Sequence, residues 1–154
     1  MNTIAQSDLI ISHTQCLVRS FKQWTGRELL PGNFTPQDLA AKIFDAPFVL
    51  VSHGIEPDPI LNYGNRAALD LWEMSWDEFT RTPSRLTAEA TKREDRAKVM
   101  EVVTRHGCFE NYSGIRISKS GKRFEISGAV IWNLISEGGQ LQGQAATFSE
   151  WKFL

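Results

Sequence analysis

The amino-acid sequence predicts an α+β domain with a single antiparallel sheet of five strands. The expected order is two helices, two strands, short helices, a longer helix and three strands, so helices gather between the second and third strands. The last three strands are joined by loops too short for parallel crossovers, and they must form an antiparallel meander. The chain of 154 residues contains no internal repeat and no long linker, which fits one domain.

Composition limits the classes of function open to this chain. Lys and Arg number 17 and Asp and Glu number 18, which gives a formal net charge of −1. Binding to phosphate backbones needs a concentrated basic face, so we expect no direct nucleic-acid partner. No apolar run is long enough to span a bilayer, and the first residues lack the pattern of a secretory signal. We therefore expect a cytoplasmic protein without a membrane partner, and Cys16 and Cys108, which match no metal spacing, suit a reducing compartment.

Two helices are expected before the first strand. Over Asp8–Trp24 the apolar residues recur at intervals of three and four, which is typical of an amphipathic helix. A second helix starts at Thr35, a capping residue followed by proline, and Pro47 ends it. We divide the chain into an N-terminal helical extension, residues 1–34, and a main domain, residues 35–154.

The middle of the chain alternates between short strands and capped helices. Phe48–Ser52 is a continuous apolar run typical of a strand buried on both faces, and Ile60–Tyr63 is a second short strand. Asn65 caps the helix that follows, and Ser75–Glu78 is a capping box for the next one. A third capping box begins the longer helix Thr91–Arg105, and the mixed charges at its start indicate an exposed helix end.

The last third of the sequence predicts three strands, Tyr112–Ser118, Arg123–Ile135 and Leu141–Phe148. Tight turns at Ser120-Gly121 and Gly138-Gly139 connect them. Strict alternation in the long middle strand predicts one face made of Phe124, Ile126, Gly128, Val130, Trp132 and Leu134.

Two stretches of this sequence resemble signature segments of the PAS fold. Tyr63–Trp72 followed by Met74–Glu78 resembles the PAS strand-to-helix segment, in which an asparagine opens the first core helix. Ile117–Phe124 resembles the PAS hairpin between the third and fourth strands. The resemblance implies a five-stranded antiparallel sheet with helices on one face, to which the N-terminal helical extension is added, and a ligand held between sheet and helices.

A closer resemblance is to the PAS-like MEKHLA domain, which occurs in bacteria and algae and at the C-terminus of plant class III homeodomain–leucine zipper proteins. Leu61–Glu73, Pro83–Ala88 and Gly143–Phe148 carry this resemblance, which covers the chain from about Asp8 onward. It implies a sensory or regulatory domain and names no ligand. This sequence has no homeodomain and no zipper heptads, so we expect it to signal through a regulatory protein partner in trans or by dimerisation.

The resemblance does not assign a cofactor. In flavin-binding light sensors of the PAS fold, a cysteine attacks the flavin and a glutamine contacts its ring, and here the aligned positions are Leu86 and Ala145. Haem-binding PAS sensors use a histidine near the position of His106, which could instead cap its own helix end. Cys108 could line the pocket or serve as a small apolar residue. No catalytic motif is present, so we expect no enzyme, and a haem sensor or an unrecognised small enzyme is the alternative.

A ligand-binding cavity is expected between the sheet and the two core helices. Arg116 would need a carboxylate partner on the inner face of the sheet, and on the outer face it would simply be solvated. The two tryptophans are large enough to fill the cavity themselves and leave a packed core. The N-terminal helix would cover its own sheet or pair two copies as a homodimer. The candidate ligand-binding residues are Tyr63, Trp72, Met74, Arg85, His106, Arg116, Trp132 and Thr147.

Overall fold

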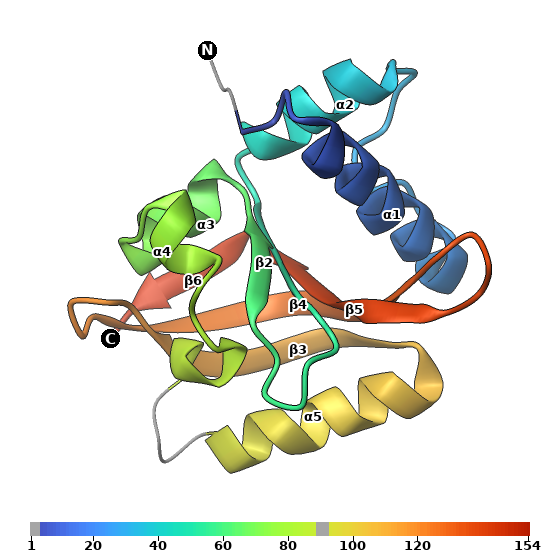
Figure 1. Ribbon diagram of the computed structural model, residues 1–154. Helices are drawn as coiled ribbons and strands as arrows, with labels where there is room; N and C mark the ends of the chain where they lie inside the picture. The colour runs from blue at the N-terminus through green and yellow to red at the C-terminus, as the bar shows by residue number, and fades with distance from the viewer. Residues whose placement is uncertain (1–3, 89–92) are drawn as a thin grey trace.

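The structure is a computed structural model that describes residues 4–88 and 93–154 (Figure 1). The sheet is antiparallel with strand order β2-β1-β5-β4-β3, and β6 pairs with β4 beyond the end of β5. The strands are β1 (Val49–His53), β2 (Leu61–Gly64), β3 (Cys108–Ile117), β4 (Arg123–Ile135), β5 (Leu141–Phe148) and β6 (Glu150–Phe153). The helices are α1 (Asp8–Thr25), α2 (Pro36–Phe44), α3 (Arg66–Trp72), α4 (Trp76–Phe79), the 3₁₀ turn η1 (Ser84–Thr87) and α5 (Arg93–His106).

The predicted element order and the antiparallel meander are confirmed, with one strand added. β5 pairs with the second half of β4, from Val130 to Ile135, which leaves the first half of β4 with a free edge. The last residues of the chain fold back along this edge as β6, where Phe124 faces Phe153 in the register. The sequence after Phe148 is too short for periodicity to predict this strand. The pairing of β6 with β4 arises instead from the uneven lengths of β4 and β5.

Helix caps fix the starts of three helices as predicted. The Thr35 hydroxyl accepts a hydrogen bond from the Asp38 amide at the start of α2. Asn65 caps α3, and Ser75 with Glu78 forms a complete capping box at α4. The expected capping box of α5 at residues 91–94 lies largely outside the described residues.

The long strand β4 changes face at Gly128, which contradicts the strict alternation expected for it. Gly128 has φ +66°, a left-handed conformation that the missing Cβ makes accessible. The register of β3 against β4 is irregular at this point. Before the irregularity Phe124 and Ile126 belong to one core, and after it Val130 and Trp132 belong to the other. One irregular residue is enough to reverse every later side chain, because the period of a strand is two.

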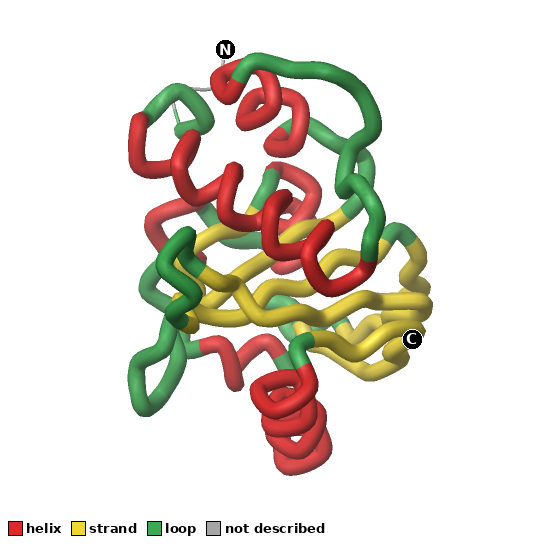
Figure 2. Tube along the Cα trace, turned by 90° about the vertical axis from the view of Figure 1, so that its right-hand side faces the viewer, coloured by secondary structure: helices red, strands yellow, loops and turns green. Residues whose placement is uncertain are grey.

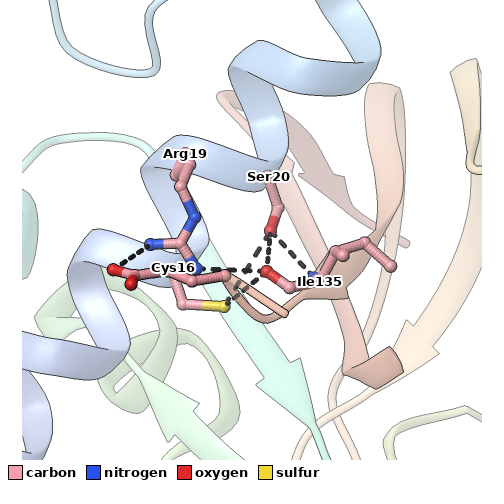
Figure 3. Close-up of polar contacts among 5 residues, drawn as sticks. Cys16, Arg19, Ser20 and Ile135 are labelled. Carbon is pink, nitrogen blue, oxygen red and sulfur yellow. Dashed lines mark hydrogen bonds and ion pairs between the residues drawn. The ribbon is translucent and has the colours of Figure 1, made fainter. Parts of the chain in front are cut away.

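The outer face of the sheet, defined here as the face covered by α1 and α2, is closed by this chain's own N-terminal helix. Leu17 is fully buried, and the Phe21 ring meets Trp132 edge to face at 4.8 Å between centroids. Figure 3 shows the anchor at the end of β4, where Arg19 and Ser20 donate to the Ile135 carbonyl. Of the two roles expected for α1, covering its own sheet is therefore the one that the structure contains.

The inner face of the sheet, opposite α1, is covered by α3, α4, η1 and α5. Figure 2 shows helices on both sides of the sheet, so the layers run helix, sheet, helix. A second core forms on the inner face, separate from the core under α1. Its buried members are Val49, Leu61, Ala68, Leu71, Trp72, Phe79, Phe124, Ile126, Ala129 and Phe148.

Candidate ligand-binding site

A cavity of about 50 Å³ lies on the inner face, between the sheet and the helices α3, α4 and α5. One buried water needs roughly 10–15 Å³ on this scale, so the space suits a few waters or a short organic molecule. Much of its wall is apolar, including Val51, Leu61, Trp72, Phe79, Ile126 and Phe148. Its polar lining consists of Ser52, His53, Ser84, Thr87, Arg96, Tyr112, Arg116 and Gln144.

Trp72 brings an unused hydrogen-bond donor to this cavity. Its side chain is 2% exposed and packs edge to face against Phe124 at 5.4 Å and Phe148 at 6.3 Å. The indole Nε1–H has no hydrogen-bond partner within the described part of the chain. Buried polar groups normally find a partner, so an orphan donor beside a cavity marks a place for an acceptor.

Arg116 reaches the cavity from the inner face of β3. It lies opposite Phe124 in the register and is only 6% exposed. Its guanidinium donates to the Ile115 carbonyl at 2.9 Å and to the Tyr112 hydroxyl at 3.2 Å, and it lies over the Tyr112 ring. Arg116 therefore lies on the inner face of the sheet, which the sequence alone left open.

Arg96 approaches the same cavity from α5. It lies one helical turn before Met100, which also lines the cavity, so both project from one side of the helix. Its guanidinium donates to the Ser84 hydroxyl of η1. Burial, and next the charge of Arg116, lower the pKa of Arg96 to about 10, so the group stays cationic at neutral pH.

Two amide side chains tie the end of α5 to the sheet beside the cavity. Gln144 Nε2 donates to the Met100 carbonyl at 3.0 Å and to the Thr104 hydroxyl at 2.8 Å. Asn133 Nδ2 donates to the Val103 carbonyl at 2.9 Å, and its own Oδ1 accepts from Gln144. These bonds add side-chain partners to carbonyls in the second half of the helix, and they hold α5 against the sheet beside the cavity.

A wider groove of about 650 Å³ opens beside the cavity, between α5 and the loop that joins β1 to β2. His53 lies where the two spaces meet, and burial keeps its pKa below the ordinary value. The residues shared by the cavity and the groove are His53, Ser84, Arg96, Met100 and Gln144.

Of the eight residues proposed from the sequence, Trp72 and Arg116 line the inner cavity. Arg85 borders the groove instead, where its side chain is half exposed and pairs with Asp58 at 3.2 Å. Met74 packs against the inner core, and its sulfur accepts a hydrogen bond from Thr82 at 3.7 Å. His106 is exposed at the end of α5.

The remaining three proposed residues belong to the outer face. Tyr63 and Trp132 are fully buried in the core under α1, and each has a buried polar atom without a partner in the described chain. Thr147 is paired with Leu50 and Val130, which belong to the same outer core, and its hydroxyl donates to the Val49 carbonyl. The face change at Gly128 explains why Trp132 lies away from the cavity.

Sequence reasoning missed several cavity residues, above all Arg96 and Gln144. Arg96 ends the mixed-charge run Lys92–Arg96, a pattern that predicts an exposed helix start. Glu94 and Asp95 are indeed exposed, but Arg96 turns inward one residue later. Its spacing of four from Met100 was the available signal. Ala145 points into the outer core. Because neighbouring residues of a strand face opposite sides of the sheet, Gln144 faces the inner cavity.

The cofactor positions considered from the sequence can now be placed. Leu86, aligned with the flavin-reactive cysteine, is 39% exposed in η1. Cys108 is half-buried, and its sulfur contacts the Trp24 carbonyl at 3.9 Å. Within residues 4–88 and 93–154, no group of three or more His, Cys, Asp or Glu side chains is placed to hold a metal ion. No helix in these ranges is long and apolar enough to cross a membrane.

Solved structures place this fold among PAS domains. The PAS domain of a protein from Colwellia psychrerythraea matches with a TM-score of 0.65 and 13% identity, over 77% of this chain and 95% of that one. An RNA-binding light-oxygen-voltage receptor matches with a TM-score of 0.63 and 16% identity over 78% of this chain, which spans 34% of the receptor. At these identities the likeness concerns the fold. No curated protein sequence matches the chain.

The family follows from the sequence itself. The MEKHLA domain model matches residues 11–153, which is nearly the entire chain and includes most of α1. The protein therefore belongs to the MEKHLA domain family, a PAS-like sensory family, and the resemblance seen in its motifs is confirmed.

Proposed function

We propose that this protein is a sensory module that holds a small molecule in the inner-face cavity. The observation that carries the proposal is a small, mostly apolar cavity into which buried donors are built, with the Trp72 indole N–H left without a partner among the described residues. Apolar walls with a few convergent polar groups are the usual form of a ligand site. Trp72, Arg96 and Arg116 supply hydrogen-bond donors, which suit binding of an acceptor group.

The proposed output is a change in α5 that a regulatory partner reads in trans. Arg96 lines the cavity from the first half of this helix, whereas Gln144 and Asn133 fasten its second half, from Met100 onward, to the sheet. A ligand that contacts Arg96 would favour one position of the unfastened half. Hydrogen exchange on ligand addition tests this: amides of residues 94–100 should gain protection, and unchanged exchange there would contradict it.

Dimerisation is the second route by which the module could signal. The apolar residues Leu17 and Phe21 are used within the chain, so the proposed pairing surface is the exposed start of α1 around Leu9, which is 83% exposed. Light scattering coupled to size exclusion should report a dimer that Leu9→Asp disrupts. The cytoplasmic setting also stays a proposal, and the two free thiols support it.

Native mass spectrometry of gently purified protein tests the sensing proposal. We expect a non-covalent mass excess over the chain that is lost in Ala129→Val, because Ala129 is a buried residue of the cavity wall and two added methyl groups would occupy the space. Ala67→Val, at a partly buried position of α3 that packs against the inner core but does not line the cavity, is the matched control and should keep the mass excess. An absorbance spectrum of the same sample tests the haem alternative, which a Soret band would favour.

The proposal fails if the wild-type chain carries no mass excess and no member of a broad small-molecule panel raises its melting temperature. Loss of the mass excess in both valine variants would indicate a general loss of structure. Circular dichroism spectra of Ala129→Val and Ala67→Val distinguish this outcome from loss of the site alone.

A further inference from the structure

Two arginines share the inner-face cavity, and the described chain supplies no carboxylate to balance them. Arg116 is 6% exposed, and Arg96 lines the same cavity from the opposite side. The ion pairs among the described residues all involve other side chains. A guanidinium withdrawn from water without a counter-charge is costly, and two of them in one cavity repel each other. A negative charge is missing from this site.

We propose that the missing charge is the ligand, and that the cavity binds a small organic anion with one carboxylate end and a short apolar body. This inference rests on the proposed function and names the chemical class of its ligand. Arginine suits the role because its planar fork of N–H donors matches a carboxylate with two parallel bonds. Arg116 has five N–H donors and uses two nitrogens in its bonds to Ile115 and Tyr112, so others are left for a ligand.

The acidic side chains near the site form no ion pair with either arginine of the cavity. Asp95 and Glu125 border a separate shallow groove that Arg116 also touches, but neither is within ion-pair distance of its guanidinium. Asp58, at the mouth of the wider groove, pairs with Arg85. Within residues 4–88 and 93–154, therefore, no carboxylate forms an ion pair with either guanidinium group.

The size and polarity of the cavity limit the body of the ligand. A volume of about 50 Å³ leaves room for a few non-hydrogen atoms, so the buried part is small. Much of the remaining wall is formed by apolar side chains such as Leu61, Ile126 and Phe148, which favour an alkyl or similar apolar body. Longer molecules could extend through the groove, because Arg96 lines both spaces. Carboxylates with two to six carbons fit this description.

Calorimetric titration of the full chain tests the proposal at neutral pH. The probes are the sodium salts of mono- and dicarboxylic acids from acetate to hexanoate and adipate, with butyramide as the neutral isostere of butyrate and sodium sulfate as an inorganic anion. We expect at least one carboxylate to bind at least tenfold more tightly than its own amide and than sulfate. Arg96→Gln and Arg116→Gln should each weaken this binding at least tenfold.

Three further variants make the test more specific. Arg116→Lys retains the charge but not the fork, so affinity should fall while the fold is kept, as circular dichroism would report. Arg105→Gln removes a charge from the exposed side of the same helix, where Arg105 pairs with Glu101, and should leave affinity unchanged. The one acidic residue of the segment outside the described ranges, Glu89, is tested by Glu89→Gln: binding that appears only in this variant would assign the counter-charge to the chain itself and overturn the proposal.

The outcomes separate this inference from the proposed function. Equal binding of butyrate and butyramide, or binding unaffected by both glutamine variants, overturns the anion and leaves a sensor of neutral molecules. Sulfate that binds as tightly as every carboxylate overturns the organic ligand. If none of the carboxylates binds, the inference is overturned. The proposed function is overturned with it only if native mass spectrometry also finds no bound molecule.

Discussion

The side chain of Asn65 connects three elements at one buried point. Its Oδ1 accepts from the amides of Leu50 and Ala68 at 3.0 and 3.2 Å, and its Nδ2 donates to the carbonyls of Ile43 and Phe48 at 3.2 and 2.8 Å. The residue is fully buried. A capping asparagine is predictable from the sequence, but its bonds to α2 and β1 are not, because they depend on the tertiary arrangement.

Asn65→Ala should destabilise the protein by about 3 kcal/mol or more, because several buried backbone groups lose their partner at once. Asn65→Asp should also destabilise, since a carboxylate would face the two carbonyls that now accept from Nδ2. Asn33→Ala, an exposed asparagine, is the control and should stay within about 0.5 kcal/mol of wild type. Urea denaturation measures all three, and a loss below about 1 kcal/mol for Asn65→Ala would contradict this role.

His13 forms a partly buried polar contact between α1 and the sheet. Its Nε2 lies 2.8 Å from the Ser52 hydroxyl, which itself donates to Asn62 Oδ1. Burial lowers the pKa of His13 from 6.5 to about 4, because the charged imidazolium would be poorly solvated under the helix. Ser52 is 1% exposed, so the hydroxyl and the imidazole form a structural pair.

This lowered pKa makes stability depend on pH. Between about pH 6.5 and 4 the unfolded chain binds more protons than the folded chain. The contribution of His13 to the free energy of unfolding is therefore complete above pH 6.5, and it is lost as the pH falls toward 4. His13 alone accounts for a loss of up to about 3 kcal/mol, and burial of His53 adds a loss of the same sign. In His13→Gln the slope of urea-measured stability against pH should be visibly shallower. An identical slope would show that His13 is solvated.

The C-terminal end of α5 meets the end of α1 at Gly107. Gly107 has φ +95°, and a Cβ there would lie 2.4 Å from the Trp24 ring. Trp24 in turn donates from Nε1 to the Asn133 carbonyl at 3.0 Å. The glycine therefore ends α5 and also lets α1 approach the sheet closely.

Gly107→Ala should destabilise the protein by about 2–4 kcal/mol, because left-handed strain and the clash with Trp24 add together. Gly121→Ala is a matched control: its φ of +92° is similar, but a Cβ there would meet nothing within 4 Å. The control should cost only about 1 kcal/mol. Thermal unfolding of both variants measures the difference, and equal losses would contradict the Trp24 contact.

Local sequence patterns predicted the helices, their caps and the strands, because each depends on residues a few positions apart. They failed where geometry is set at a distance. The reversal at Gly128 moved Trp132 to the outer core, and no alternation pattern contains that information. Arg116 was identified as a residue in need of a partner, but its companion Arg96 comes from another element. Burial of a charge is a tertiary property, so a charged run alone did not reveal it.

The helix α1 and the sheet should unfold as one unit. Phe21 is 5% exposed and packs edge to face against Trp132, so Phe21→Ala should cost about 3–5 kcal/mol and lower the temperature of a single transition seen equally by tryptophan fluorescence and far-ultraviolet circular dichroism. Gln23→Ala, at an exposed position of the same helix, should change stability by less than about 0.5 kcal/mol. Two separate transitions would instead indicate that residues 1–34 form an independent extension.

The layered arrangement gives this small molecule one closed core under α1 and one core with a cavity under α5. A high-resolution crystal structure of gently purified protein tests that account most directly. It should contain electron density for a non-water molecule in the inner-face cavity, within hydrogen-bonding distance of Arg116, Arg96 or the Trp72 indole nitrogen. A cavity filled by the chain's own side chains, with both guanidinium groups paired to its own carboxylates, would contradict the sensory account.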